Sequence, residues 1–310
     1  MIPIPHILEP MSDEEVMERQ SRPSQRSILL EASLTGENYA AKWAAFNKNE
    51  TYGKAGTDPR NISTSVAAIK LKYARFTYPF TDVVLGTQKW YAFNCTPREC
   101  AQRIADILVG KSHAVLADGN RYDGHVKRPE RLVERAIMLR SFKPQYHAEL
   151  NENMDAQIGI PGTTREGRKY FSGYGRGSGS QETSPFNSAG TAFTGYCARR
   201  ETLVNGRRTP PDIAWSQLGI YGGDDSLESD VDPESLRKAA ANVGQDYEIT
   251  VVRNGELGIE FLNRQFGPNI WTGDLDSMAN PRRLLEKLWT GPTNLLNPIE
   301  RFAERLSGYY

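Results

Sequence analysis

The chain has 310 residues, 38% of them hydrophobic and 25% charged, which is typical of a globular protein long enough to bury a full core. Lysine plus arginine and aspartate plus glutamate number 38 each, so the net charge gives no sign of nucleic-acid binding. A nucleic-acid-binding protein of this composition would need a channel that is basic only locally. Three cysteines exclude a disulfide framework, and we expect all three to be reduced thiols. No run approaches the ~18 apolar residues of a membrane span. The first residues also lack the basic segment followed by an apolar segment that is typical of a signal peptide. Any membrane recruitment is therefore expected through regions outside this chain.

Taken in chain order, the hydrophobic spacing predicts strands and helices in irregular alternation. Short apolar runs indicate strands, while apolar residues three to four apart, with a capping residue or proline at their start, indicate helices. The predicted elements are a strand over 113–118, a helix over 129–142, a helix opened by Ser184-Pro185, strands over 214–221 and from 226, a helix from Asp232 to Gly244, and strands over 247–252 and 257–262. Asn254-Gly255, between the last two strands, is a hairpin signal. This order predicts an α+β fold and not a doubly wound parallel sheet.

One stretch is unusually rich in glycine. Residues 167–179 carry five glycines together with Arg168, Lys169 and Arg176. Composition alone favours a flexible surface loop. The position just before a predicted helix favours a loop whose backbone approaches a ligand closely.

Two carboxylate clusters follow predicted strands. The first is Asp118-Gly-Asn-Arg-Tyr-Asp123, and the second is Asp224-Asp225 in a predicted hairpin turn. Adjacent like charges repel, and a folded protein tolerates such crowding mainly when a cation lies among the carboxylates. Magnesium prefers a few carboxylates together with phosphate oxygens and water. Gly-Gly-Asp-Asp is equally an ordinary turn composition, so for the second cluster alone a turn and a metal site both stay open.

A basic segment lies closer to the N-terminus. From 42 to 75 there are seven basic and two acidic residues, in a stretch that includes Phe46-Asn-Lys48-Asn-Glu50, Lys54 and Asp58-Pro-Arg60-Asn-Ile62. A triphosphate and its leaving pyrophosphate require several cations, and arginine offers them a bidentate fork. A solvated basic face is the alternative interpretation of the same composition.

The order of these motifs resembles that of the RNA-dependent RNA polymerases of positive-strand RNA viruses. The similarity is to the nodavirus-like group first and the tombusvirus-like group second, and it runs from about residue 46 to residue 266. It implies a right-hand polymerase fold of the α+β class, with an RRM-like antiparallel palm sheet. The implied division is fingers over 1–112, palm over 113–142, a fingers insertion over 143–171, palm again over 172–266, and a truncated thumb over 267–310.

By this resemblance the acidic residues form the catalytic centre. Asp118 and Asp224 would bind two Mg²⁺ ions, for which Mn²⁺ could substitute, and Asp225 would have a lesser catalytic role. Asp123 and Asn187 would share the ribose 2′-hydroxyl, a polar contact that selects ribonucleotides over deoxyribonucleotides.

The resemblance also implies nucleotide contacts outside the acidic centre. Lys48, Lys54 and Arg60 would grip the incoming triphosphate. Ser178-Gly179, with Thr183 four residues on, is similar to the family's loop and helix that approach the template and the nascent pair.

Two assignments match the family pattern less closely. Arg264, in the stretch 261–266, resembles the hairpin that supports the primer end, although a core strand with an exposed arginine is the alternative interpretation. Where the family usually supplies a lysine as general acid, this chain offers Arg253 before the predicted hairpin turn and Lys238 on a predicted helix. Arginine is a poor proton donor because it stays charged, so the general acid is an open point.

The implied function is template-directed RNA synthesis in viral genome replication, in the host cytoplasm and within membrane-associated replication complexes. The partners would be an RNA template, the nascent strand and ribonucleoside triphosphates. Three alternatives stay open. The chain could be an incomplete polymerase fragment that only binds RNA, since relatives have a larger thumb and fuller fingers. A nucleotide cyclase similar to diguanylate cyclases shares a Gly-Gly-acidic turn, and a reverse transcriptase is disfavoured by the pair Asp123 and Asn187.

Overall fold

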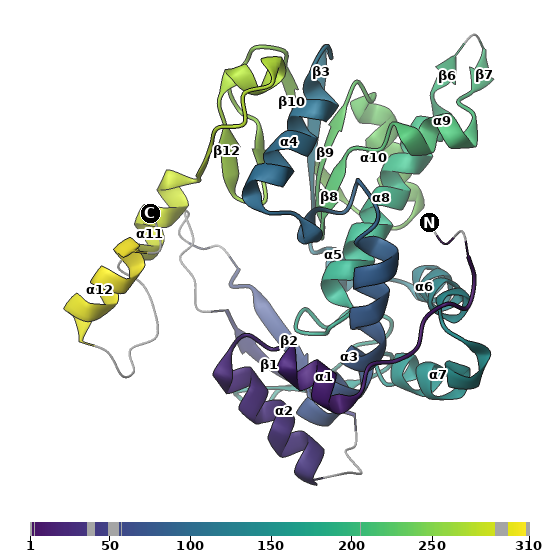
Figure 1. The fold of residues 1–310 in the computed structure, drawn as a ribbon, viewed down its shortest axis with the longest axis vertical. Helices are drawn as coiled ribbons and strands as arrows, with labels where there is room; N and C mark the ends of the chain where they lie inside the picture. The colour runs from purple at the N-terminus through teal and green to yellow at the C-terminus, as the bar shows by residue number, and fades with distance from the viewer. Residues whose placement is uncertain are drawn as a thin grey trace.

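Helices and strands are mixed, and two four-stranded sheets lie at opposite ends of the body (Figure 1). The computed structural model describes residues 2, 4–35, 41–48, 56, 58–204, 206–288 and 297–307. We call the two sheets the upper sheet and the lower sheet, after their places in Figure 1. The α+β class predicted from the sequence is confirmed.

The upper sheet is antiparallel throughout, with the strand order β10-β3-β9-β8. Its strands are β3 (His113–Gly119), β8 (Ile220–Gly222), β9 (Asp225–Ser229) and β10 (Tyr247–Arg253). Helix α8 (Thr183–Glu201) lies in the connection from β3 to β8, and α10 (Pro233–Asn242) connects β9 to β10. A β-α-β-β-α-β order with the first strand in the middle is the RRM-like arrangement that the resemblance implied.

Successive side chains of β3 point to opposite faces of the upper sheet. Val115 and Ala117 share a core with α10 on one face. Ala114 and Leu227 share a core with helix α4 on the other face. Both faces are therefore covered, which leaves the strand ends as the open part of this sheet.

Helix α4 (Pro97–Leu108) begins with a capping box. Thr96 Oγ1 accepts a hydrogen bond from Glu99 N, and the Glu99 carboxylate accepts one from Thr96 N. Ile104 and Leu108, one turn apart, are fully buried against the upper sheet. The boundary between fingers and palm was expected at residue 112. Helix α4 therefore falls in the expected fingers, although it packs on the upper sheet, which was expected for the palm.

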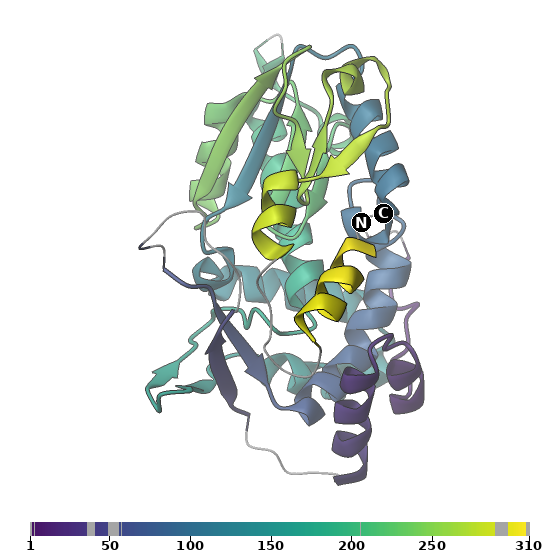
Figure 2. The ribbon, with the colours of Figure 1, turned by 90° about the vertical axis from the view of Figure 1, so that its left-hand side faces the viewer.

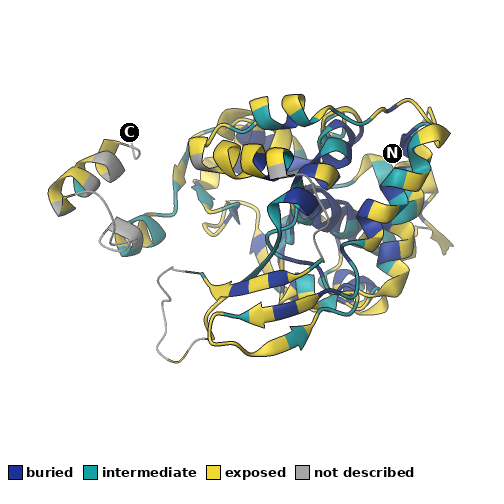
Figure 3. Ribbon diagram, turned by 90° about the horizontal axis from the view of Figure 1, so that it is seen from below, coloured by how far each residue is buried: buried dark blue, intermediate teal, exposed yellow. Residues whose placement is uncertain are grey.

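The lower sheet joins two segments that are far apart in the sequence, in the order β2-β1-β4-β5. Its strands are β1 (Trp43–Asn47), β2 (Asn61–Ser65), β4 (Pro161–Thr164) and β5 (Lys169–Phe171). Strand β1 is antiparallel to β2 and parallel to β4. Buried residues occur on β1 and β4 but not on β2 or β5, so a large part of this sheet faces solvent, as the view from below shows (Figure 3).

Helices fill the space between the sheets and flank the lower one (Figures 1 and 2). They are α1 (Asp13–Glu18), α2 (Pro23–Thr35), α3 (Ala67–Pro79), a π-helical turn (Phe80–Leu85), α6 (Arg128–Ser141) and α7 (His147–Asp155). A single aromatic-rich core ties α3, the π-helical turn, α6 and α7 to α8 and β8, and it includes Tyr73, Phe80, Phe142, Phe186 and Tyr221. Of the two sheets, this core includes a residue of the upper one, Tyr221 on β8. Helices α1 and α2 pack on α3 through a separate small cluster of Val16, Leu29, Leu71 and Ala74.

The remaining elements are short or peripheral. They are α5 (Tyr122–His125), the hairpin β6 (Leu203–Val204) and β7 (Arg207–Arg208), α9 (Pro211–Ser216), the small sheet of β11 (Glu260–Phe261), β12 (Arg264–Phe266) and β13 (Ser277–Ala279), α11 (Pro281–Leu288), α12 (Pro298–Ser307), and 3₁₀ turns at Ala92–Asn94, Pro144–Tyr146 and Pro268–Thr272. Helices α11 and α12 stand apart from the body (Figure 1). None of the helices in the described ranges is long and apolar enough to span a bilayer.

Two sequence predictions are wrong for single elements. Residues 214–216, predicted to start a strand, lie in α9 because Pro211 opens a helix there, and β8 is limited to Ile220–Gly222. The hairpin predicted around Asn254-Gly255 is a turn whose flanking segments join different sheets. A two-residue hairpin of the expected type needs positive φ at both turn residues, and only Gly255 has it, at +83°.

Candidate active site

The acidic residues lie at one end of the upper sheet. The antiparallel register of β3 with β9, continued by one residue, places Asp118 opposite Asp225 and Gly119 opposite Asp224. On the other side of β3, Glu248 of β10 is the register partner of Asp118. Directly opposite residues of antiparallel strands project from the same face. Three carboxylates therefore form a row across three strands, with Asp224 beside it.

The turn that carries Asp224 is a two-residue hairpin loop. Gly222 pairs with Asp225, so Gly223 and Asp224 form the loop. Gly223 has φ +72° and Asp224 has a negative φ, which fits a type II′ turn with glycine first. A Cβ atom on Gly119 would lie 3.1 Å from the Asp224 Cβ, so the bare backbone of Gly119 lets the turn approach β3 closely.

Asp224 and Asp225 are half-buried, Asp118 is more exposed, and the three aspartates repel one another. Burial raises the pKa of Asp118, against an opposing effect of Arg60. Burial also raises the pKa of Asp224, and the charge of Asp118 adds to that shift. For Asp225, burial together with Asp118 and Asp224 raises the pKa to about 7. Negative charge is thus concentrated here beyond what the neighbouring arginine offsets.

The chemistry of these donors suits Mg²⁺. This ion is commonly held by one or two carboxylates, with water and substrate phosphates completing an octahedron. In the part of the chain that the structure describes, no three His, Cys, Asp or Glu side chains already enclose a metal ion. A bound cation would relieve the repulsion that raises the pKa values of Asp118, Asp224 and Asp225. The donor set therefore fits an ion that enters with its substrate.

Asp123 and Asn187 meet beside the acidic row. Asn187 Nδ2, on α8, donates a hydrogen bond to Asp123 Oδ1, on α5, at 2.9 Å. Burial raises the pKa of Asp123, while the bond from Asn187 and the charge of Arg176 oppose the shift. The buried Asn187 Oδ1 has no hydrogen-bond partner among the described residues. The pair thus keeps a buried acceptor available for a donor from outside the protein.

The glycine-rich loop is fastened to the lower sheet. Ser63 N, on β2, donates to Ser178 Oγ at 3.1 Å, and Gly179 N donates to Ser63 O at 2.9 Å. A Cβ on Gly179 would lie 3.1 Å from Thr64, so glycine is what permits this approach. Thr183 Oγ1 donates to Gly177 O at 2.8 Å and closes the loop onto the start of α8.

The basic residues of the expected triphosphate grip lie on the lower sheet's side. Lys48 N, just after β1, donates to Arg60 O, just before β2, at 2.7 Å. Arg60 is exposed, and its charge lowers the pKa of Asp118, Asp224 and Asp225 against the effect of burial. Arg60 is therefore near the acidic row, whereas Lys54 lies outside the described residues.

The expected general acids do not lie with the aspartates. Arg253 is the register partner of His113, at the other end of β3 from Asp118, about 17 Å away at ~3.4 Å per residue. Lys238 is on the exposed side of α10, which packs on the sheet face opposite to the one that carries Asp118. The structure brings neither side chain to the acidic row.

The hairpin expected to support the primer lies against the turn of Gly223 and Asp224. Leu262 and Asn263, at the tip between β11 and β12, both have positive φ, as a tight hairpin requires. A Cβ on Gly222 would lie 2.8 Å from Leu262, so the hairpin tip packs on the turn. Arg264 donates from Nε to Ser277 Oγ at 3.0 Å and from Nη2 to Ser277 O at 2.9 Å, which links β12 to β13.

Sequence reasoning missed a second cluster of charges, behind the glycine-rich loop. Arg131 donates a hydrogen bond to Glu182, Arg176 donates one to Glu134, and Tyr73 donates one to Glu182 at 2.9 Å. All of these side chains are buried. We call Arg131, Glu134, Arg176 and Glu182 the ion-pair cluster. Its sequence signal is the arginine of the glycine-rich stretch, and the cluster was missed because its members come from two separated parts of the chain, α6 and the stretch from Arg176 to Glu182.

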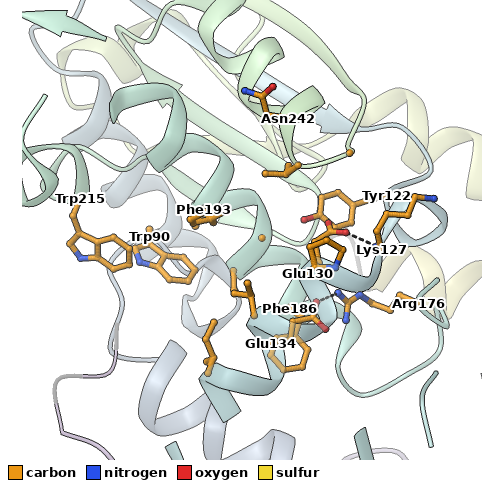
Figure 4. Close-up of a pocket in the computed structure, with 18 residues that line it drawn as sticks. Trp90, Tyr122, Lys127, Glu130, Glu134, Arg176, Phe186, Phe193, Trp215 and Asn242 are labelled. Carbon is orange, nitrogen blue, oxygen red and sulfur yellow. Dashed lines mark hydrogen bonds and ion pairs between the residues drawn. The ribbon is translucent and has the colours of Figure 1, made fainter. Parts of the chain in front are cut away.

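A cavity of about 440 Å³ is lined mainly by residues of α6 and α8 (Figure 4). Trp90 and Trp215 line one side of it, and Arg176 and Glu134 of the ion-pair cluster line another (Figure 4). Phe193 lines it as well and is half-exposed. None of the three aspartates at the end of the upper sheet lines this cavity, so it is distinct from the candidate active site.

No protein-family model matches the chain. The RNA-directed RNA polymerase of Striped jack nervous necrosis virus is 32% identical over 279 residues, which are 89% of this chain and 27% of that protein. The RNA-directed RNA polymerase of Pariacoto virus is 29% identical over 318 residues, which cover 100% of this chain and 31% of that protein. The chain thus spans less than a third of the length of these curated relatives.

A solved structure matches over almost the whole chain. The insertion loop deletion mutant of the RNA-dependent RNA polymerase of a human picorbirnavirus aligns with a TM-score of 0.76 and 13% identity, over 99% of this chain and 66% of that chain. The fold is therefore that of the RNA-dependent RNA polymerases. By sequence, the chain is homologous over most of its length to nodavirus RNA-directed RNA polymerases.

Proposed function

We propose that this chain is the catalytic core of a viral RNA-dependent RNA polymerase, which extends an RNA 3′ end with ribonucleotides on an RNA template. The proposal is supported above all by the row of carboxylates at the end of the upper sheet, beside the pair Asp123 and Asn187. The homology to nodavirus RNA-directed RNA polymerases supports it independently.

Two Mg²⁺ ions, when bound, supply the Lewis acidity that activates the primer 3′-hydroxyl and neutralises the leaving pyrophosphate. Asp118 and Asp224 would hold them, with Asp225 adding negative charge directly across from Asp118. Because burial and its neighbours raise the pKa of Asp225 to about 7, this carboxyl must lose its proton before the site is fully charged. Arg60 and Lys48, together with Lys54, would bind the triphosphate from the side of the lower sheet.

The selection of ribonucleotides would fall to the pair Asp123 and Asn187. The buried Asn187 Oδ1 has no partner of its own among the described residues, and a ribose 2′-hydroxyl supplies a hydrogen-bond donor. A deoxyribonucleotide would leave that acceptor unpaired, which costs binding energy. Base choice would come from pairing with the template, so the protein needs to recognise geometry and not base edges.

The template and primer would be placed by the parts that flank the acidic row. Ser178, Gly179 and Thr183 hold the glycine-rich loop between β2 and α8, where its backbone would approach the nascent pair. Arg264 would support the primer end through the hairpin that packs on the catalytic turn. We do not extend the proposal to Arg253 or Lys238 as general acids, since both lie away from the acidic row.

Primer extension on a short RNA template, with Mg²⁺ and labelled ribonucleotides, tests the proposal. We expect templated incorporation by the chain as it stands and a loss of about 10³-fold on Asp224→Asn. Asp106→Asn, which changes an exposed aspartate on α4, is the matched control and should keep full activity. Near-normal elongation by Asp224→Asn would overturn the assignment of the metal site.

A second candidate function is RNA binding without turnover. It is favoured because the chain spans less than a third of the relatives' length, and turnover would then require segments of those relatives that the chain does not match. RNA that binds but is not extended would support this candidate. In either case we place the protein's action in viral RNA replication in the host cytoplasm, with membrane recruitment supplied by other regions.

A further inference from the structure

The turn that carries Asp224 is held from behind by two hydroxyl groups of α8. Ser188 Oγ accepts a hydrogen bond from Gly223 N at 2.8 Å, and Thr191 Oγ1 donates one to Gly223 O at 2.9 Å. Ser188 Oγ also donates to Ser184 O at 2.8 Å, so its proton is committed to its own helix and its lone pairs are left for Gly223. One turn of α8 thus binds both polar groups of the Gly223 backbone.

The geometry of the turn makes these two bonds consequential. In a two-residue hairpin loop, the flanking pair exchanges the ladder bonds, and the first loop residue is left with an unpaired N–H and C=O. Gly223 is that first loop residue, and it is buried. Without Ser188 and Thr191, its backbone would lack partners in a place that water reaches poorly, and the turn would relax toward solvent.

Helix α8 is itself fixed to the upper sheet at its other end. Arg199 Nε donates to Glu228 Oε2 at 3.0 Å, and Arg199 Nη2 donates to Ser229 O at 3.1 Å. Both side chains of this ion pair are buried. The helix therefore offers the turn a fixed support and does not move freely with it.

We propose that Ser188 and Thr191 are positioning residues of the active site, which set the place of Asp224 by holding Gly223. The inference rests on the proposed function for its consequence, since a displaced carboxylate matters only where it binds the catalytic ions. Asn187, the residue before Ser188, reaches Asp123 from the same helix. One helix thus keeps the ribose-sensing pair and the metal-binding turn in register with each other.

A purely structural role makes a different prediction from a positioning role. If the two hydroxyls only add stability, their loss lowers the melting temperature and the amount of active protein, and leaves the metal requirement of the remaining molecules unchanged. If they position Asp224, their loss weakens divalent-ion binding and lowers kcat in protein that is still folded. Misplacement of a catalytic group by about 1 Å can cost ~10²-fold in rate.

The test compares Ser188→Ala, Thr191→Val and their double variant with two matched variants. Thr191→Ser keeps the hydroxyl and removes only the methyl group. Thr194→Val makes the same change one turn further along α8, where Thr194 Oγ1 donates to Gly190 O of its own helix at 3.0 Å and does not touch the turn. Thermal melting identifies the folded variants, and Thr191→Val alone carries the test if the double variant does not fold.

Two readouts do not depend on activity. Amide hydrogen exchange of a peptide covering 220–226 should be about tenfold faster in the double variant, because the turn opens more often. Titration with Mn²⁺ should show weaker binding in the same variant. In steady-state assays kcat should fall about 10- to 100-fold, with KM for ribonucleotides within about twofold of the unmodified chain. Thr191→Ser should restore most of the loss, and Thr194→Val should behave as the unmodified chain.

Unchanged exchange and unchanged Mn²⁺ binding in the folded double variant would overturn the inference. A rise in KM alone, or an equal loss in Thr194→Val, would overturn it as well. If the unmodified chain incorporates no nucleotide, the proposed function fails. Exchange and Mn²⁺ titration then still decide whether the two hydroxyls hold the turn.

Discussion

Two groups of carboxylates in this chain, those of the ion-pair cluster and those at the end of the upper sheet, differ in how far neighbouring arginines compensate their charge. In the ion-pair cluster, two arginines face two buried glutamates: Arg131 and Arg176 outweigh the effect of burial at Glu182 and lower its pKa, while burial still raises the pKa of Glu134 against the same two arginines. At the end of the upper sheet, burial and mutual repulsion raise the pKa of Asp118 and Asp225. One group is compensated by arginines of the same fold, and the other concentrates charge that its neighbours do not offset.

The difference separates a structural role from a functional one. A buried carboxylate that is paired inside the protein fixes segments to each other, as the ion-pair cluster does for α6, the glycine-rich loop and the start of α8. Bringing carboxylates together without compensating cations lowers the stability of the folded protein, and a bound metal ion removes that repulsion. Charge compensation, more than burial, therefore points to the site of chemistry in this molecule.

The comparison predicts opposite signs for charge removal in the two groups, and the largest effect is in the ion-pair cluster. Glu182→Gln removes the carboxylate shared by Arg131 and Arg176 and leaves buried positive charge unpaired. We expect a loss of about 3–5 kcal/mol in the free energy of unfolding, measured by urea denaturation. The control is Glu149→Gln, which breaks a partly exposed pair with Arg75 and should cost under about 1 kcal/mol. A loss below 1 kcal/mol for Glu182→Gln would contradict the comparison.

Charge removal at the end of the upper sheet should stabilise the metal-free protein. The folded-state pKa of Asp225 is about 7 against an ordinary 3.8, so the folded chain holds this proton more tightly than the unfolded chain does. Stability should therefore fall as pH rises from about 4 to about 7 and stay lower above that. Asp225→Asn has no such carboxyl and should not lose this stability. With chelator at pH 8 we expect the variant to be more stable than the unmodified chain by about 2 kcal/mol, a figure reduced from the full pKa shift because Asp225 is partly exposed. Equal stability of the two proteins at pH 8, or a stability difference that does not shrink toward pH 4, would argue against the buried repulsion.

The next effect concerns selectivity and not stability. Asn187→Ala removes both the bond to Asp123 and the buried acceptor proposed for the ribose 2′-hydroxyl. We expect the preference for ribonucleotides over deoxyribonucleotides, as a ratio of kcat/KM, to fall about tenfold, which corresponds to one hydrogen bond. Competition between a ribonucleotide and its deoxy analogue in primer extension measures that ratio. Since Ser188 and Thr191 do not touch the pair, the double variant of those residues should keep its preference within about threefold.

Much of this organisation could be predicted from the sequence, because it is local. The apolar run of β3, the capped start of α10 and the glycine-to-helix transition before α8 are each set by residues close together in the chain. The acidic motifs could be assigned to one centre by their resemblance to a family. The carboxylate that lies opposite Asp118 could not be predicted from the sequence. Tertiary packing fixes the strand register, and a shift of one residue moves every side chain to the other face of the sheet.

Helix α6 shows why the ion-pair cluster was missed. Its bounds were close to the prediction, but the face that turns inward carries Arg131 and Glu134, while Leu132 and Val133 are each 53% exposed. Hydrophobic spacing favours the opposite orientation. The partners that make burial of the charged face tolerable, Arg176 among them, lie more than 40 residues further along the chain.

An exposed ion pair completes the comparison and should have the smallest effect. Arg121, between Asp118 and Asp123 in the sequence, contacts Asp58 at 3.2 Å, but the two side chains are 74% and 86% exposed. Water and salt screen such a pair, so Asp58→Ala should change the free energy of unfolding by less than about 0.5 kcal/mol, and raising the salt concentration should bring that difference closer to zero. Urea denaturation at low and high salt checks both points. A loss above 1 kcal/mol would mean that this contact, like the ion-pair cluster, fixes two segments to each other, and burial would then no longer separate the structural charges from the solvated ones.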